Sequence, residues 1–259
     1  MIEEPYRWVE AIANRGEYIE TQLAAGSPIV ALGYRDGILF LTLGRTRQKL
    51  FEIYDRIAMG AIGHPGDIER LRMAAIELAS TEGFTRSAAD VSLRRLAYYS
   101  LSPVLKTAFE QVYGAPYLAR LLFAEIGVKQ ENDLFLRLEY DGAIATNNAT
   151  FTQTRQDFGA LSGTRASTEL MERYLAAEYS AGATFERALK LSLDAWTVGH
   201  LALGEAGVKE FPGRDKILAE RKERLRAAGI EAAILERDNK TAIRYRTLAE
   251  TEIRSGLGE

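Results

Sequence analysis

The stretch Ser27–Asp67 decides the fold, and it reads SPIVALGYRDGILFLTLGRTRQKLFEIYDRIAMGAIGHPGD. Two short apolar runs, Ile29–Leu32 and Ile38–Leu41, are separated by Tyr34-Arg35-Asp36-Gly37. Asp-Gly between two β-prone runs is a strong hairpin signal, because glycine adopts a positive φ without strain. The beginning of this stretch therefore predicts a β-hairpin.

The rest of the stretch predicts a third strand and the start of a helix. A basic loop with Lys49 is followed by one mixed run through Ile53, Ile57 and Ile62, which predicts a single strand. The cluster Gly63-His64-Pro65-Gly66-Asp67 predicts a turn, with Asp67 as the N-cap of the next helix. The expected order is strand, turn, strand, basic loop, strand, turn, helix.

Composition allows a packed core and excludes several kinds of site. The chain has 259 residues, of which 47% are apolar, and this suffices for one large domain or two small ones. A net charge of −3 gives no global sign of nucleic acid or an anionic membrane as partner. The absence of cysteine excludes disulfides, thiolate zinc sites and cysteine nucleophiles, and it fits a reducing cytosol. With only His64 and His200, a histidine-rich metal centre is excluded, and no metal or cofactor is expected.

Targeting signals are not evident in the sequence. No apolar run approaches the roughly 18 residues that a membrane-spanning helix needs. The opening MIEEPYRW is acidic where a secretory signal would be basic and then apolar. We therefore expect a soluble, cytoplasmic protein with no membrane partner.

Helical and strand patterns alternate along the chain. The stretch from residue 88 to 113 predicts a helix that Pro103 bends or splits at about Ser102. Asp141-Gly142 predicts a second tight turn. A helix capped by Ser167 or Thr168 runs to about residue 179, after a loop at 159–163. The other expected elements are helices at 5–24, 67–80 and 184–203 and strands at 121–127, 134–140, 143–146, 230–235 and 242–248.

This order predicts an α+β fold. Strands, two helices, strands, two helices and strands follow one another, and short turns imply mainly antiparallel sheets. Four amphipathic helices need two sheet faces to cover, so the economical arrangement is a four-layer α/β/β/α sandwich. We expect one domain over residues 1–259, with a helical extension at 1–25, a charged insertion at 205–228 and a polar tail at 250–259.

Several pieces of this chain resemble the proteasome core-particle family. They are IVALGYRDGILFLT, QKLFEIYDRIAMGAIG followed by DIERLRMAAIELA, LEYDGAI, and GIEAAILERDNKTAIRYRTL. They occur in the family's order and span roughly residues 27–249, apart from the insertion. The helix before the first strand and the segment QKLFEIYDRI are most similar to the α-type subunit of the actinobacterial branch. The resemblance implies the four-layer sandwich that hydrolases with an N-terminal nucleophile share.

The resemblance also implies that the chain has no catalytic residues. Active β-type subunits use a freed N-terminal threonine, an acidic residue after the second strand and a lysine on the third, because a hydroxyl needs a base to take its proton. The matching positions here hold Ser27, Leu43 and Lys49. Leucine cannot orient or balance the lysine, and Pro28 restricts the backbone beside the serine.

Two residues would bind an activator if this is an α-type subunit. In such subunits the matching lysine, Lys49, lines a pocket between neighbours that holds the C-terminal carboxylate of a ring ATPase or other activator. Gly63 falls beside the incoming tail, where glycine permits close approach. The plainer alternatives are a solvated loop lysine next to Arg45 and Arg47, and an ordinary turn glycine.

The first residues would form a gate. By resemblance, they crowd the axial pore of the ring. Archaeal and eukaryotic members carry a Tyr-Asp-Arg gate motif near the N-terminus, but here that triplet occurs only as Tyr54-Asp55-Arg56, in the expected third strand. The residues assigned to the gate are Met1, Ile2, Glu3, Glu4, Pro5 and Tyr6.

Three functions remain open from the sequence. The first is a non-catalytic α-type subunit in a homo-oligomeric ring that caps a β-type peptidase ring and docks a ring ATPase; the resemblance implies a heptamer. The second is an amidohydrolase that uses Ser27 after self-cleavage behind Gly26. The third is a self-assembling scaffold with neither partner. None of the three involves nucleic acid.

Overall fold

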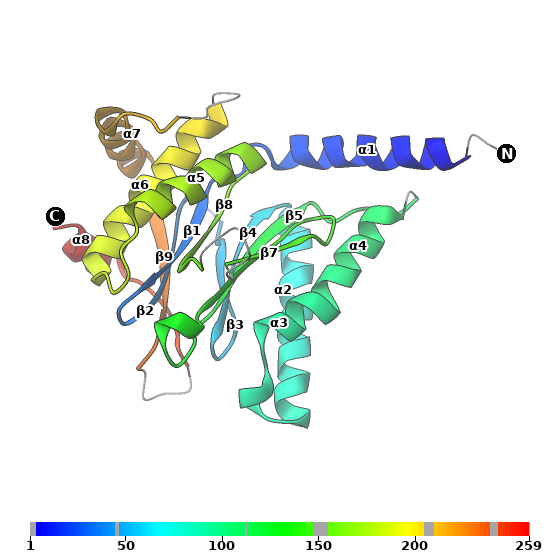
Figure 1. The fold of residues 1–259 in the computed structure, drawn as a ribbon, viewed down its shortest axis with the longest axis horizontal. Helices are drawn as coiled ribbons and strands as arrows, with labels where there is room; N and C mark the ends of the chain where they lie inside the picture. Colours follow the sequence, from blue (N-terminus) through cyan, green and yellow to red (C-terminus); the bar gives the residue numbers. More distant parts are fainter. Residues whose placement is uncertain are drawn as a thin grey trace.

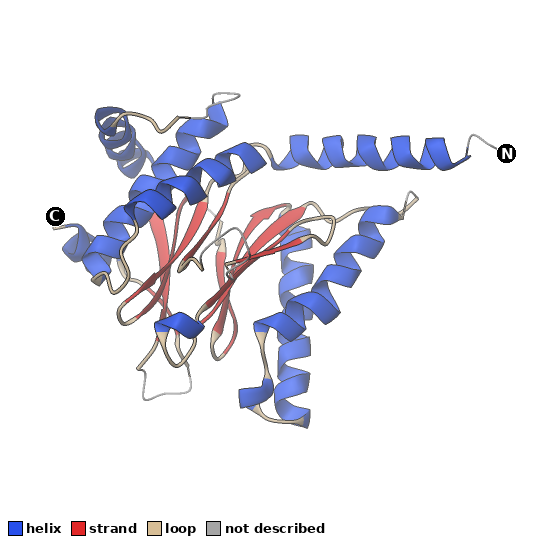
Figure 2. Cartoon of the chain, in the orientation of Figure 1, coloured by secondary structure: helices blue, strands red, loops and turns tan. Residues whose placement is uncertain are grey.

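The computed structural model describes residues 4–44, 47–111, 113–147, 155–204, 210–238 and 243–258. Two five-stranded sheets lie face to face, and helices cover the outer side of each (Figures 1 and 2). This is the predicted four-layer α/β/β/α sandwich, and the α+β fold class is confirmed.

The first sheet brings together the beginning, middle and end of the chain. Its strand order is β10-β9-β2-β1-β8, and its neighbouring strands pair antiparallel. Every residue of β1 and nearly every residue of β2 is buried, which explains their continuous apolar runs. The strands are β1 (Ile29–Tyr34), β2 (Gly37–Gly44), β8 (Phe158–Leu161), β9 (Gly229–Glu236) and β10 (Tyr245–Thr247).

The second sheet is an antiparallel meander. Its strands follow one another in chain order, β3-β4-β5-β6-β7. Between the two sheets lies an apolar core to which both contribute, including Phe40 of the first sheet and Phe135 of the second. The strands are β3 (Leu50–Tyr54), β4 (Ile57–Gly63), β5 (Ala119–Glu125), β6 (Leu134–Leu138) and β7 (Ile144–Thr146).

Two helical layers close the sandwich, and each has its own apolar core against its sheet. The second sheet is covered by α2 (Pro65–Thr85), α3 (Leu93–Arg95), η2 (Leu96–Leu101) and α4 (Ser102–Glu110). The first sheet is covered by α5 (Arg165–Glu178) and α6 (Phe185–Gly204), and α7 (Arg214–Ala227) and α8 (Glu250–Leu257) pack on α6. Short 3₁₀ turns are η1 (Ala88–Asp90) and η3 (Gln130–Asn132). None of the helices in the described ranges has the length and apolar composition that a membrane crossing requires.

The first hairpin is confirmed, but its glycine has a different role from the one predicted. Arg35 and Asp36 form the turn, and Gly37 opens β2 without a positive φ. A Cβ at Gly37 would lie 2.1 Å from the backbone oxygen of Leu235 in the neighbouring strand β9. Glycine is needed here because two backbones approach closely, not because the turn is left-handed.

Two strand predictions were wrong. The run from residue 50 to 62 is not one strand but the hairpin β3–β4, so that Asp55 and Arg56 form its turn. The expected loop at 159–163 instead contributes β8 to the edge of the first sheet. Gly159 lies where a Cβ would be 2.9 Å from Leu122 of the facing sheet, so its glycine reflects close packing between the sheets and not a turn.

Two predicted helix caps were also wrong. His64 caps α2 through Nδ1, which accepts the Gly66 N–H at 3.2 Å, whereas Asp67 accepts the Leu118 N–H at 3.0 Å. Thr164 caps α5 and accepts the Ser167 N–H at 3.2 Å. In both cases the predicted cap lies about one turn inside the helix, where its side chain serves a tertiary contact.

Elsewhere the helical predictions are confirmed in one case and wrong in another. Pro103 splits the helix predicted over residues 88–113, as expected: the π-helical turn η2 ends at Leu101, and α4 starts with Pro103 in its first turn. The expected polar tail forms α8, which buries Ile253 and Gly256 against α6. The short apolar face of this helix could not be recognised in the sequence, because charged residues surround it.

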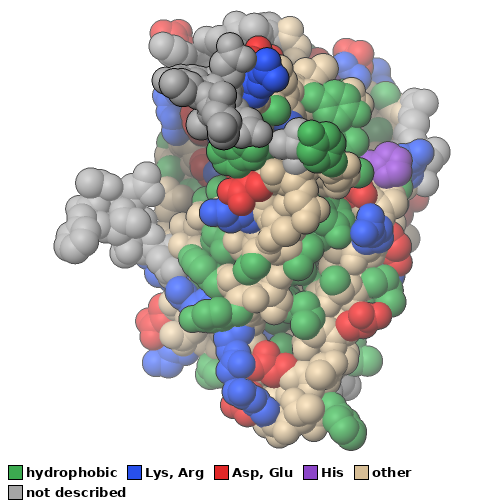
Figure 3. Space-filling model, turned by 90° about the vertical axis from the view of Figure 1, so that its right-hand side faces the viewer, with side chains coloured by type: hydrophobic (Ala, Val, Ile, Leu, Met, Phe, Trp, Pro, Cys, Tyr) green, Lys and Arg blue, Asp and Glu red, His purple; other side chains and the backbone are tan. Residues whose placement is uncertain are grey.

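The helical layer of α2 to α4 exposes several large apolar side chains. Figure 3 looks onto the side of the molecule that carries these helices and shows hydrophobic side chains gathered down its middle. Phe84 is 92% exposed and Tyr99 is 82% exposed. Other large apolar side chains exposed on this layer are Met73, Leu78, Tyr98 and Val104.

The N-terminal helix α1 (Glu4–Leu23) leaves the body of the molecule along one edge of the sandwich (Figure 1). Its second half packs against the body of the molecule, where Ile19 and Leu23 are buried with Tyr140. Arg15 donates hydrogen bonds to the Ala108 and Gly114 carbonyls, at 3.1 and 2.6 Å. The first half extends outward, and it exposes Trp8 and Val9.

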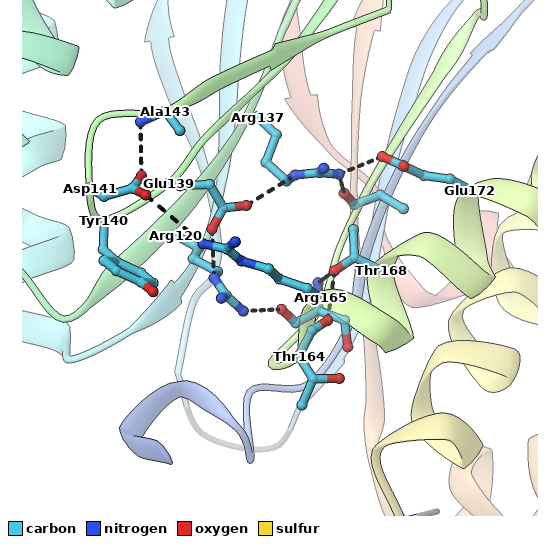
Figure 4. A network of polar contacts seen from close by, with 12 residues as sticks. Arg120, Arg137, Glu139, Tyr140, Asp141, Ala143, Thr164, Arg165, Thr168 and Glu172 are labelled. Carbon is cyan, nitrogen blue, oxygen red and sulfur yellow. Dashed lines mark hydrogen bonds and ion pairs between the residues drawn. The ribbon is translucent and has the colours of Figure 1, made fainter. Parts of the chain in front are cut away.

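A buried arginine fixes α1 to both sheets (Figure 4). Arg120 of β5 is 1% exposed, and it pairs with Glu20 of α1 at 2.6 Å and with Glu139 at 2.7 Å. Its guanidinium also donates to the Gly163 carbonyl at 2.8 Å, beside the start of α5. Burial and a hydrogen bond to Glu20 raise the pKa of Tyr140 to about 12. The extension is therefore held by a network and not by apolar contact alone.

The same network continues into the helical layer on the other side. Glu139 also pairs with Arg137 at 3.1 Å, and Arg137 pairs with Glu172 of α5. Burial raises the pKa of Glu172, and the charge of Arg137 opposes that shift. Figure 4 shows Glu139, Arg137 and Glu172 as a row of successive pairs beside Arg120.

Candidate functional site

A cavity of about 670 Å³ lies where the link between α1 and β1 meets the loop before β3 and the start of α2. Three separate segments form its wall, because the first sheet, the second sheet and the helical layer meet at this point. Ser27, Lys49 and Gly63, which the resemblance had singled out, all line it. Its other lining side chains include Phe51, Ile68 and Glu69.

Lys49 supplies a half-buried cation to this cavity. It stands directly before β3, and its carbonyl accepts the Ala61 N–H at 3.0 Å. Burial lowers the pKa of Lys49, while the charge of Glu231 opposes the shift. Within the described ranges, no carboxylate comes within ion-pair distance of the Lys49 ammonium. Its charge can therefore pair with an incoming anion.

Gly63 is needed by the fold itself. It ends β4 with a φ of +138°, a region that favours glycine, and a Cβ there would lie 2.0 Å from the Leu118 oxygen. Its backbone is exposed on the cavity wall, close to the segment of Lys49. The residue type is thus explained by the neighbouring strand, independently of any ligand.

We expect Gly63→Ala to lower the free energy of unfolding of this chain, even in the absence of any binding partner. The left-handed φ costs about 1–3 kcal/mol for a residue with a Cβ, and the contact with Leu118 adds to it. Thermal unfolding of the isolated variant measures this loss, with Gly213→Ala as control because a Cβ there meets nothing within 4 Å. An unchanged melting temperature for Gly63→Ala would contradict this explanation.

Ser27 is not arranged as a nucleophile. Its hydroxyl donates to the Leu43 carbonyl at 2.9 Å, and the chain runs through it from α1 into β1. The Leu43 side chain is 3% exposed and belongs to the core on the helical side of the first sheet. The position that would hold the catalytic acid therefore carries an apolar group that points away from the lysine.

The mouth of the cavity carries charges of both signs. Arg47 lines it and is exposed, as is Glu69 in the first turns of α2. Arg72 pairs with Glu69 at 2.7 Å and lies over the Phe51 ring at 5.6 Å. This arrangement gives the opening an apolar floor with a polar rim. Arg45 lies outside the described residues.

The residues assigned to a gate are only partly described. Met1, Ile2 and Glu3 lie outside the described residues, and so do the side chains of Glu4, Pro5 and Tyr6. Across the residues that the structure describes, no three His, Cys, Asp or Glu side chains are grouped as ligands for a metal ion.

Sequence reasoning missed Glu231, which supports the cavity from behind. Its carboxylate accepts the backbone N–H groups of Lys49 and Leu50. The signal was present, since Glu231 interrupts the apolar strand GIEAAIL at a position that faces the other sheet. A charge at such a position usually has a specific partner.

The four-layer α/β/β/α sandwich is the fold of the class of proteins related to the N-terminal-nucleophile hydrolases. The chain is 34% identical over 188 residues to a proteasome subunit alpha of Streptomyces coelicolor, a match that covers 72% of this chain and 69% of that protein. It is 32% identical over 208 residues to the proteasome subunit alpha of Kineococcus radiotolerans, with 76% and 78% covered. A proteasome subunit alpha of a Nocardioides species matches 96% of this chain at 28% identity over 252 residues. No protein-family model matches the chain.

The chain belongs to the family of proteasome α subunits. The resemblance inferred from the sequence pieces is confirmed.

Proposed function

We propose that this chain is a non-catalytic α-type subunit of a 20S-like proteasome. Copies of it form a heptameric ring that caps a ring of β-type peptidase subunits, restricts entry of substrates and docks a ring ATPase. The observation that carries the proposal is that Lys49 and Gly63 line one cavity while Leu43, at the position of the catalytic acid in active subunits, is an apolar core residue. No cofactor or metal takes part.

The arrangement around Ser27 supports a non-catalytic role. The Ser27 hydroxyl donates its hydrogen to a backbone carbonyl, and among the described residues no carboxylate forms an ion pair with the Lys49 ammonium in the same cavity. A hydroxyl without a base is a poor nucleophile.

Exposed apolar side chains support assembly with other subunits. The first half of α1 exposes Trp8 by 47% and Val9 by 60%, and Tyr18 is 52% exposed. The layer of α2 to α4 exposes a further apolar patch (Figure 3). Apolar patches of this kind mark contact surfaces with other chains. We propose that α1 contacts neighbouring α subunits and that Met1–Tyr6 form the gate at the pore.

The cavity supports docking of an activator tail. An ammonium in a partly desolvated pocket selects a terminal carboxylate through charge and hydrogen bonding. Lys49 would hold the carboxylate, and the exposed backbone at Gly63 would lie beside the tail. In a ring, the cavity would be completed by the next subunit.

One observation keeps a second function in view. Ser27 and Lys49 line the same cavity, as a nucleophile and its base would in an amidohydrolase released by cleavage between Gly26 and Ser27. A scaffold without peptidase or ATPase partners is the third candidate, and it is separated from the first by co-purification with a β-type subunit.

Intact-mass measurement separates the first two functions. We expect the purified protein to keep the mass of the whole chain, 28.8 kDa, and to be unreactive towards hydroxyl-directed inhibitors. The Ser27→Ala variant should behave in the same way and serves as the control. Loss of residues 1–26 from the wild type but not from Ser27→Ala, with inhibitor labelling, would favour the hydrolase.

We further propose that residues 1–259 form one domain of a cytoplasmic protein without nucleic-acid or membrane partners. The core between the sheets receives residues from the beginning, middle and end of the chain, which supports one folding unit. The small net charge supports the absence of nucleic acid. The helix α7 in the 205–228 insertion buries only Ile217 among its described residues, and we assign it a surface role.

A further inference from the structure

A carboxylate lies on the inner face of the first sheet, where apolar side chains are expected. Glu231 of β9 shares this face with Ala233 and Leu235, which belong to the core between the sheets. It is half-buried and does not line the cavity that contains Lys49. A charge in such a place needs compensating partners.

Its partners are backbone groups of the loop that carries Lys49. The Lys49 N–H lies 2.9 Å from Oε1 and 3.1 Å from Oε2 of Glu231, and the Leu50 N–H lies 2.9 Å from Oε1. Hydrogen bonds from N–H groups to a carboxylate are stronger than those to neutral acceptors. Through them, the first sheet holds the chain where it enters β3 of the second sheet.

We propose that Glu231 is the positioning residue of the tail pocket, because it fixes the backbone of Lys49 and stabilises the ammonium that this backbone presents to the cavity. This inference rests on the proposed function, in which Lys49 anchors a carboxylate. Glu231 itself does not touch the tail, and it acts through Lys49.

The electrostatics of the pair are consistent with this role. Burial lowers the pKa of Lys49, and the negative charge of Glu231 raises it again. Burial also raises the pKa of Glu231, while its two backbone donors and the charge of Lys49 lower it. Each charge therefore offsets part of the cost of burying the other.

Other charged and titratable groups surround the two residues. Arg47 of the same loop and Glu69 of α2 face the cavity beside Lys49. Tyr245 of β10 lies close to Glu231 and to Glu52 of β3. Burial raises the pKa of Tyr245, and the negative charges of Glu231 and Glu52 raise it further. Burial, and then the charge of Asp55, raises the pKa of Glu52.

The sign of the expected pH dependence follows from these groups. Only protonated Lys49 attracts a carboxylate, so tail binding persists below the pKa of Lys49 and is lost as the pH rises through it. Removing the charge of Glu231 lowers the pKa of Lys49 further, because burial is then unopposed. The loss of binding should move to lower pH.

Glu231→Gln tests the inference, because the amide keeps an oxygen that can accept a backbone N–H and removes the charge. The variant is studied in the complex with the β-type subunit. The pH dependence of Lys49 acetylation is followed by peptide mapping, and binding is measured with a fluorescent peptide of the C-terminus of the ring ATPase from the same genome. We expect the acetylation midpoint of Lys49 to fall and the peptide affinity near pH 7.5 to drop about 10-fold, the equivalent of about one charged hydrogen bond.

Glu236→Gln is the matched control, since it removes a carboxylate from the same strand that pairs with Arg246 at 3.2 Å. It should leave both readouts unchanged. Glu231→Asp keeps the charge, and it should keep the acetylation midpoint near that of the wild type. If Glu231→Gln does not fold, Glu231→Asn replaces it, because this variant also removes the charge and keeps an amide oxygen. An unchanged midpoint and affinity in Glu231→Gln would overturn the inference. If the wild type does not bind the peptide while the midpoint still shifts, the proposed tail site fails and the coupling of Glu231 to Lys49 stands.

Discussion

We expect the Lys49→Ala variant to assemble with its β-type partner as the wild type does and to lose most of its affinity for an activator tail. A hydrogen-bonded charge pair with a carboxylate contributes about 1.5–3 kcal/mol, so the affinity should fall about 10- to 100-fold. Assembly should survive because the Lys49 side chain lines a cavity and contributes to none of the three main apolar cores.

Fluorescence anisotropy with the tail peptide measures this loss, and native mass spectrometry checks assembly. Lys129→Ala is the control, because it removes a lysine that is 74% exposed, directly before the η3 turn between β5 and β6. A peptide with an amidated C-terminus should bind the wild type as weakly as the free-acid peptide binds Lys49→Ala. Equal affinities of wild type and Lys49→Ala for the free-acid peptide would remove the anchor assignment.

We expect Arg120→Met to be the most destabilising single change in the polar network of Figure 4. Removing one partner from a buried ion pair costs about 3–5 kcal/mol, because the other partner is left charged and unpaired. Here both Glu20 and Glu139 lose a partner at 2.6–2.7 Å. Arg165 at 3.4 Å from Glu20 and Arg137 at 3.1 Å from Glu139 remain, so the cost should lie near the lower end of that range.

Chemical denaturation gives the free energy of unfolding, and hydrogen exchange locates the change. Exchange should rise first in the second half of α1, which Glu20 holds to the sheet. Arg254→Met is the matched control, because its pair with Glu250 is 65% and 77% exposed and is expected to contribute less than about 1 kcal/mol. If both variants lose the same stability, the network does not anchor the extension.

The order of the layers could be predicted from the sequence, because it depends on how apolar residues are spaced along the strands and helices. Buried strands such as β1 and β2 read as continuous apolar runs, and α2, α5 and α6 carry apolar stripes that need a sheet to cover. The split at Pro103 was predictable for a similar reason, since proline cannot continue a helix.

Features that depend on neighbours distant in sequence could not be predicted. Gly37 and Gly159 look like turn residues, but each is glycine because another strand approaches it. The helix caps were predicted at Asp67 and Thr168 and not at His64 and Thr164, because Asp and Thr are suitable cap residues by type. In the structure, Asp67 and Thr168 instead accept hydrogen bonds from the Leu118 and Ser162 N–H groups.

The site shows the same division. Lys49 and Gly63 were identified through resemblance, and the structure brings them into one cavity with Ser27. Glu231 is 182 residues from Lys49 along the chain, and no local pattern links the two. Its position inside an apolar strand was a signal of a special role, but its partner could be found only from the packing of the two sheets.

Native mass spectrometry of this chain, co-expressed with the β-type proteasome subunit of the same genome, tests the central claim most directly. The account predicts a ring complex of both chains in which every copy of this one keeps its full 28.8 kDa mass and proteolysis depends on the β-type nucleophile. A complex without β-type subunits, or copies of this chain that begin at Ser27 and hydrolyse peptides themselves, would contradict it.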